Sequence, residues 1–177
     1  MQVQKNNYAR KVIAPHADRV LATVLFTDIV ESTQQLMRLG DVAWRRLLDD
    51  HDKLAHRLVV QHRGRLIKMT GDGILASFDG PGRAIKSATT FSGAAAHIGL
   101  KLRAGLHTGE VEVRGEDIAG VTVNVAARIM NEAGPGEIFV SRVVTDLVAG
   151  AGVNFFRQAP RKLKGLPGRW DLFATEC

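Results

Sequence analysis

Apolar residues recur along the chain at two spacings, one typical of strands and one typical of helices. A continuous apolar run at residues 21–26 predicts a buried strand, with Asp28 just after its carboxyl end. From residue 36 to 59 the apolar positions recur mainly at helical spacing, after a potential helix cap at Ser32. They predict one helical segment that ends before Gly64.

Residues 67–78 contain two short apolar runs that flank Gly71-Asp72-Gly73. An Asp-Gly pair between such runs predicts a β-hairpin, because glycine accepts the positive φ of a tight turn. The turn would place Asp72 at an exposed tip and Lys68 on the incoming strand. The same pattern also fits an ordinary hairpin in which Asp72 shapes the turn and Lys68 is solvated.

The second half of the chain alternates between the two spacings in the same way. Its expected elements are a helix at 81–98, a strand at 100–106, a separate short strand at 111–113, a helix at 121–129, a strand at 138–140 and a helix at 143–148, before a weakly alternating tail. The whole order begins βαββαβ. It predicts an α+β fold, a ferredoxin-like (palm-like) split βαβ antiparallel sheet with helices, extended by a C-terminal β/α segment.

The length of 177 residues predicts one domain. Residues 1–20 are polar and basic without a sustained period, so we expect an N-terminal arm or linker there and the domain at 21–177. Such an arm would connect the domain to an upstream regulatory domain in a longer parent protein. With Cys177 as the single cysteine and no apolar run long enough to span a membrane, we expect a cytoplasmic location without a membrane span.

The net charge of +6 favours a polyanionic partner, such as nucleic acid, an acidic membrane surface or a polyphosphate substrate. Composition alone does not choose among these three. The sequence contains no recognisable nucleic-acid-binding module, and aromatic residues make up only 6% of it, which disfavours base-stacking surfaces. We therefore expect no nucleic-acid partner.

Asp28 and Asp72 are the first candidates for chemistry, because a split βαβ sheet makes their strands neighbours. Two carboxylates at one edge repel each other unless a cation lies between them, and Mg²⁺ is typically held by one or two carboxylates together with substrate phosphates. The helix start after Asp28 would offer backbone N–H groups to phosphate. A metal-dependent phosphoryl-transfer site is one interpretation, and a helix cap plus a turn residue is the other.

Asn124 and Arg128 stand four residues apart on an expected helix and so share one face. Arginine forks onto phosphate oxygens and asparagine can hold a ribose oxygen, although a solvated helix face has the same pattern. Asp117 lies in a glycine-flanked loop, where it fits a turn role equally well. For His107, which has no cysteine or histidine at metal-ligand spacing, we expect a structural role.

Five segments together give the chain a family resemblance. It resembles the catalytic domain of class III adenylate cyclases, in the bacterial nucleotide cyclase family, over residues 20–173. The segments are F-T-D-I-V-E-S-T at 26–33, K-M-T-G-D-G at 68–73, G-L-H-T-G-E-V at 105–111, D-I-A-G-V-T-V-N-V-A-A-R at 117–128 and L-K-G-L-P-G-R-W at 163–170.

The resemblance implies an adenylate cyclase that converts ATP to 3′,5′-cyclic AMP and pyrophosphate by a two-metal mechanism. It implies that Asp28 and Asp72, assisted by the carbonyl of Ile29, hold two divalent cations, Mg²⁺ or Mn²⁺. It also implies that Lys68 donates to adenine N1 and that Asp117 accepts from the exocyclic amine. Guanine presents the opposite donor and acceptor pattern at those atoms.

By the same resemblance, Asn124 positions the ribose and Arg128 stabilises the charge that develops on the phosphates. Lys164 is the candidate for the family's triphosphate-binding lysine, with Lys162 and Arg169 close by. The chain departs from the family at Glu31, where relatives commonly have glycine. An acidic side chain there would lie beside the triphosphate loop and would either weaken ATP binding or alter the loop.

The resemblance further implies a homodimer with shared active sites. One subunit would supply the metal ligands Asp28 and Asp72, and the other would supply Lys68, Asp117, Asn124 and Arg128. One alternative is a non-catalytic nucleotide-binding or dimerisation module that keeps the fold and regulates a partner. Another is a different palm-like two-metal enzyme, such as a polymerase or diguanylate cyclase, to which the second set of residues does not belong.

Overall fold

The protein, analysed as a computed structural model, is described from residue 18 to residue 176. Its helices and strands follow the βαββαβ order and then continue into a C-terminal extension. In chain order they are β1 (Arg19–Ile29), α1 (Ser32–Leu39), α2 (Asp41–Gln61), β2 (Arg65–Met69), β3 (Gly73–Phe78), α3 (Pro81–His97), β4 (Leu102–Arg114), β5 (Asp117–Ala119), α4 (Val121–Glu132), β6 (Ile138–Ser141), α5 (Arg142–Leu147), β7 (Phe155–Arg157) and β8 (Leu172–Thr175).

The strands form one sheet of eight, in the order β2-β3-β1-β4-β6-β8-β7, with β5 paired to β4 beside this path. The pairing is antiparallel throughout the described sheet except between β4 and β6, which are parallel. The first four strands with α2 and α3 are the predicted split βαβ unit. The predicted α+β fold class is therefore confirmed, with a C-terminal extension of β6, α5, β7 and β8.

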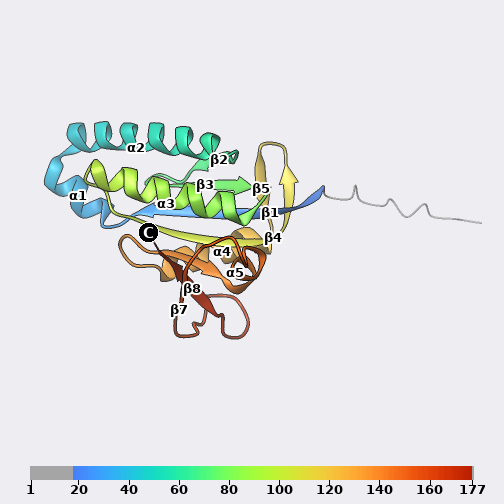
Figure 1. The fold of residues 1–177 in the computed structure, drawn as a ribbon. Coiled ribbons are helices and arrows are strands. Elements are labelled where there is room, and N and C mark those ends of the chain that lie inside the picture. The colour runs from blue at the N-terminus through green and yellow to red at the C-terminus, as the bar shows by residue number, and fades with distance from the viewer. Residues whose placement is uncertain (1–17, 177) are drawn as a thin grey trace, which may run out of the picture.

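Helices cover both faces of the sheet (Figure 1): α2 and α3 lie on one face, and α4 lies on the other. Successive side chains of β1 point alternately to these two faces. Leu25 and Ile29 are buried against α2 and α3, whereas Val24 is buried in the cluster that includes Ala126 of α4. The same alternation places the side chain of Asp28 on the α4 face.

Three predicted boundaries are wrong. The helical segment is two helices, because Gly40 between α1 and α2 has φ 78° and breaks the hydrogen-bond ladder. The strands expected at 100–106 and 111–113 are one strand, β4, in which His107 and Gly109 stay paired with β1. Strand β1 begins at Arg19, inside the expected arm; residues 1–17 of that arm lie outside the described part of the chain.

Gly105 lets α4 pack directly on the backbone of β4. A Cβ atom at this position would lie 2.2 Å from the amide nitrogen of Met130 and 2.6 Å from the carbonyl oxygen of Ala126, which are both backbone atoms of the helix. The close approach fixes the height of α4 above the sheet. Within residues 18–176, no helix is long and apolar enough to span a membrane.

Candidate functional site

Asp28 and Asp72 meet at the end of β1. Asp28 is the penultimate residue of β1 and faces Gly73 of β3, so the residue before that glycine lies beside it. The Ile29 amide donates to the Asp72 carbonyl at 2.9 Å, and the Ser32 hydroxyl donates to the Asp72 carboxylate at 2.5 Å. The Asp72 side chain is therefore half-buried and held from α1, in contrast to the exposed hairpin tip that the sequence predicts.

Gly73 makes this convergence possible. A Cβ atom there would lie 1.9 Å from the carbonyl oxygen of Thr27, so any larger residue would force β3 away from β1. The hairpin connection includes Gly71 at φ 99° and is closed by a hydrogen bond from the Thr70 amide to the Gly73 carbonyl at 2.9 Å. Both glycines of the Gly-Asp-Gly segment thus serve the placement of Asp72.

Arg103 of β4 neutralises Asp28 in this structure. Its Nε and Nη2 atoms donate to Oδ2 of Asp28 at 2.9 and 2.6 Å, and the two side chains are mostly buried. The pairing follows from the sheet register, in which Asp28 faces Arg103 directly. The sequence reasoning missed this residue, because its link to Asp28 spans 75 positions and depends on the register of β1 with β4.

The pKa of Asp28 is raised above its ordinary value, first by burial and further by the neighbouring carboxyl of Asp72. The guanidinium of Arg103 acts in the opposite direction. Two acidic groups in contact, one of them mostly buried, make a site where a bound cation relieves repulsion.

The residues at this end of β1 fit divalent cations. Two carboxylates and nearby carbonyl oxygens are the hard ligands that Mg²⁺ and Mn²⁺ prefer, and Mg²⁺ takes one or two carboxylates when phosphates complete its shell. No group of three or more His, Cys, Asp or Glu side chains that could hold a metal ion converges anywhere in residues 18–176, so at this site the chain itself offers only the two carboxylates. The predicted metal ligands Asp28, Ile29 and Asp72 are thus brought together, although their role stays a prediction.

Lys68 and Asp117 form a second pair of candidate residues. The Nζ atom of Lys68 donates to Oδ2 of Asp117 at 2.7 Å, across 49 positions of sequence, and both side chains are about half exposed. The other carboxylate oxygen accepts from the Ile118 amide at 2.8 Å. These hydrogen bonds, that of Lys68 foremost, lower the pKa of Asp117. The pair presents one donor and one acceptor side by side to solvent.

Asn124 and Arg128 share one face of α4, as predicted, opposite the side on which Thr122 and Ala126 are buried. Asn124 is exposed and Arg128 is half-buried. Neither side chain forms a hydrogen bond or ion pair within the described residues. Lys164 is exposed in the turn after the buried Leu163, and no contact in the described chain brings it to the other candidates.

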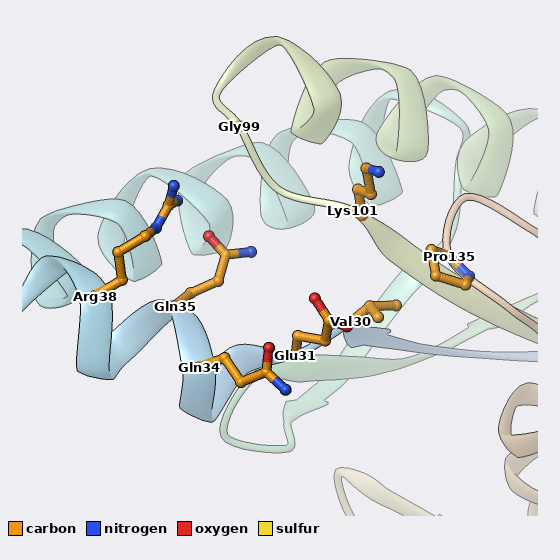
Figure 2. A pocket seen from close by; sticks show the side chains of 8 residues that line it. All are labelled: Val30, Glu31, Gln34, Gln35, Arg38, Gly99, Lys101 and Pro135. Atoms are coloured by element: carbon orange, nitrogen blue, oxygen red, sulfur yellow. The ribbon is translucent and has the colours of Figure 1, made fainter.

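A polar cavity of about 500 Å³ lies at the junction of β1 and α1. Figure 2 shows its lining side chains, among them Glu31 between β1 and α1, Gln35 of α1 and Lys101 just before β4. Glu31 has φ 57° and ψ 33°, the left-handed conformation that favours glycine. The strain and the carboxylate both occur at the position where the family resemblance expects glycine.

His107 makes the contacts of a packed side chain, and its structural role stays a prediction. Its Nδ1 atom is 2.7 Å from the hydroxyl oxygen of Ser141, and its ring meets that of Trp170 edge-on at 5.8 Å between centroids. Burial lowers the pKa of His107 to about 4. The ring is therefore neutral near pH 7.

The split βαβ core carries the paired carboxylates at the end of β1 and the exposed lysine–aspartate pair, which defines an α+β domain with two clusters of candidate functional residues. The sequence of the chain matches the family model of the adenylate and guanylate cyclase catalytic domain over residues 14–175. The chain belongs to this family.

Relatives and solved structures agree with that assignment. The chain is 31% identical over 157 residues to "Putative adenylate cyclase 3" of Rhizobium meliloti, covering 84% of this chain and 27% of that protein. It is 33% identical over 125 residues to an adenylate cyclase of Streptomyces coelicolor, covering 70% and 32%. The chain thus matches about a third or less of the length of these two relatives.

The fold is similar to that of the adenylyl cyclase CyaB from P. aeruginosa, with a TM-score of 0.82 at 19% identity over 90% of this chain and 95% of that one. The crystal structure of an adenylate/guanylate cyclase/hydrolase from Silicibacter pomeroyi gives a TM-score of 0.80 at 25% identity over 89% and 97%.

Proposed function

We propose that the chain is an adenylate cyclase domain that converts ATP to 3′,5′-cyclic AMP and pyrophosphate at sites shared by two subunits. The observation that carries the choice of adenine is the pair formed by Lys68 and Asp117. Its ammonium is a donor suited to adenine N1, and its carboxylate is an acceptor suited to the exocyclic amine. Guanine carries a donor at N1 and an acceptor at O6, so the pair would repel it.

The phosphates of ATP would lie at the end of β1. Asp28 and Asp72, with the Ile29 carbonyl, would hold two Mg²⁺ or Mn²⁺ ions. When bound, these ions supply charge neutralisation at the α-phosphoryl group and lower the pKa of the ribose hydroxyl. Arg103 is already in the site, and a cation at Asp28 would free its guanidinium to bind phosphate oxygens.

The chemical step is an in-line displacement. The 3′-hydroxyl gives up its proton to solvent and its oxygen forms a bond to the α-phosphorus, while the bond from that phosphorus to the bridging oxygen breaks and pyrophosphate leaves. Asn124 would orient the ribose, and Arg128 would stabilise charge on the phosphoryl oxygens in the transition state. Lys164 would hold the triphosphate. Asn124 and Arg128 have no described side-chain partner, which supports their being available to a ligand.

A homodimer is part of the proposal. Met69 is 37% exposed and Val121 is 68% exposed, and both are apolar. Met69 directly follows Lys68, and Val121 is one helical turn before Asn124. Apolar surface beside functional side chains supports a subunit contact at this place. Another solved structure with a similar fold is a non-canonical dimeric guanylyl cyclase domain from Blastocladiella emersonii.

The test is product analysis. The purified chain is incubated with ATP or GTP and with Mg²⁺ or Mn²⁺, and the products are identified by mass spectrometry. We expect cyclic AMP from ATP and far less cyclic GMP from GTP. Absence of any cyclic nucleotide would overturn catalysis and favour the non-catalytic module, whereas preference for GTP would overturn the adenine assignment.

A paired substitution tests the role of the base-reading residues. Lys68→Glu places an acceptor opposite guanine N1–H, and Asp117→Asn offers a donor to O6. We expect the double variant to lose preference for ATP and gain relative activity with GTP, measured as the ratio of the two kcat/KM values. An unchanged ratio would contradict base recognition by this pair.

A further inference from the structure

The hairpin that carries Asp117 is a short appendage of the sheet. Strand β5 has only three residues and forms a ladder only with β4 among the described strands. The connection is the two-residue loop Gly115-Glu116, in which Gly115 has φ 62°. Figure 1 shows this hairpin standing at the end of the sheet near the N-terminal end of β1, close to β2. Its position relative to β2 must therefore come from contacts beyond the ladder.

Two side chains of β2 tie the hairpin down. Lys68 bonds to the Asp117 carboxylate, as described above. Arg65, at the start of the same strand, donates through Nη2 to the backbone carbonyls of Glu116 at 2.5 Å and Gly115 at 3.4 Å. Within the described residues, these are the only side-chain hydrogen bonds between β2 and the β4–β5 hairpin; Ile67 of β2 adds a non-directional apolar contact with the cluster that includes Ile118.

The two ties respond differently to a bound base. In the proposed complex, Lys68 and Asp117 turn from each other toward the purine, so the hydrogen bond between them weakens as the ligand enters. Arg65 bonds only backbone carbonyls of the loop, which take no part in base recognition. Its contact is the hydrogen-bonded one that still holds the hairpin when the site is filled.

We propose that Arg65 is a positioning residue for purine selectivity. It holds the Gly115-Glu116 loop, and this clamp keeps Asp117 at a fixed distance from Lys68. The inference rests on the proposed adenylate cyclase function and extends it to a residue outside the base contacts. A loosened hairpin would let the carboxylate move away from the exocyclic amine. Recognition of adenine would suffer more than the phosphoryl-transfer step.

The test compares Arg65→Gln, which removes the cation and shortens the reach, with Arg65→Lys, which restores a cation able to bond one carbonyl. Arg45→Gln on the exposed side of α2 is the control, because it changes the net charge equally and Arg45 has no described side-chain partner. We expect Arg65→Gln to raise KM for ATP roughly tenfold and to lower the ATP-to-GTP ratio of kcat/KM by a similar factor. We expect kcat within about twofold of wild type and partial recovery in Arg65→Lys.

An equal loss with ATP and GTP, or kinetics like those of Arg45→Gln, would overturn the clamp. Amide hydrogen exchange of residues 113–119 gives a readout that needs no activity. We expect faster exchange in Arg65→Gln, with the larger difference when a non-hydrolysable ATP analogue is bound. If the wild-type chain makes no cyclic nucleotide, the proposed function fails, while unchanged exchange in Arg65→Gln separately refutes the clamp.

Discussion

Glu31 combines two unfavourable properties at one residue. Its backbone is left-handed, with φ 57°, and its carboxylate lines the polar cavity beside the proposed phosphate site. A non-glycine residue in this conformation costs about 1 kcal/mol or more. Backbone strain and charge can be separated, because glycine relieves both and glutamine removes only the charge.

We therefore expect Glu31→Gly to raise the free energy of unfolding by about 1 kcal/mol, and Glu31→Gln to leave it nearly unchanged. Both variants should lower KM for ATP, because each removes a negative charge near the triphosphate. Urea unfolding and steady-state kinetics measure the two effects. If only Glu31→Gly lowers KM, loop geometry rather than charge limits binding.

His107 gives a prediction about pH. Because burial lowers its pKa to about 4 in the folded chain, against about 6.5 unfolded, the unfolded state binds the proton more readily. The stability that depends on the neutral ring is fully present above pH 6.5 and is lost as the pH falls toward 4, by about 2–3 kcal/mol. In His107→Gln, which does not titrate, this part of the slope should disappear.

Urea unfolding between pH 4 and pH 8 measures the difference between wild type and His107→Gln. The exposed His56 on α2 supplies the control variant His56→Gln. A parallel pH dependence in wild type and His107→Gln would contradict the assignment of the slope to His107.

At the scale of elements, the contact between α4 and β4 determines where Asn124 and Arg128 lie. At Gly105 the atoms nearest to an added Cβ would be backbone atoms of the helix, so no helix side chain could move aside to make room. Gly105→Ala must move the helix, and we expect a loss of about 3 kcal/mol of folding free energy together with reduced activity. Thermal unfolding and product formation measure the two losses.

Gly93→Ala on α3 is the matched control, because Gly93 is exposed and no atom lies within 4 Å of the added Cβ. Helix propensity predicts that it stabilises the protein by roughly 0.5–1 kcal/mol. Equal effects of the two substitutions would contradict the direct packing of α4 on β4.

Sequence periodicity predicted the elements because most of them bury a regular apolar face. It failed at two glycines whose structural roles the apolar pattern does not reveal. Gly109 stays within β4, where an added Cβ would lie 2.6 Å from the hydroxyl of Thr122, so the strand continues past the predicted break. Gly40 does end a helix, yet the apolar pattern continues across it into α2.

The candidate site was predictable only where its residues stand close together in recognisable segments. The ties of Arg65 and Arg103 join residues 50 to 75 positions apart. They depend on strand register and on the bend of the β4–β5 hairpin, and no local pattern encodes either. The half-buried state of Asp72 was missed for the same reason, since Ser32 reaches it from a different element.

At the scale of the whole molecule, shared sites predict complementation between inactive variants. Asp72→Ala removes a proposed metal ligand, and Arg128→Ala removes the proposed transition-state cation. In a mixed dimer, one of the two sites contains neither substitution. Random pairing at equal amounts should thus restore about a quarter of wild-type activity, whereas each variant alone should be nearly inactive.

The measurement is cyclic AMP formation after co-refolding or co-expression of the two variants. Dilution of the wild-type chain should lower the activity per chain in the same concentration range in which the dimer dissociates. A mixture no more active than its parts, or a specific activity independent of concentration, would contradict shared sites.

The position of β8 bears on how the chain is made. This strand lies between β6 and β7, and within the described sheet β7 pairs with nothing else. During synthesis, β6 emerges well before β8, which is its outer neighbour in the sheet. Until β8 has been made, the apolar strand β6 has one unpaired edge. A ribosome that pauses between β6 and β8 would therefore expose an aggregation-prone intermediate, and the folding of this half of the sheet must wait for Thr175.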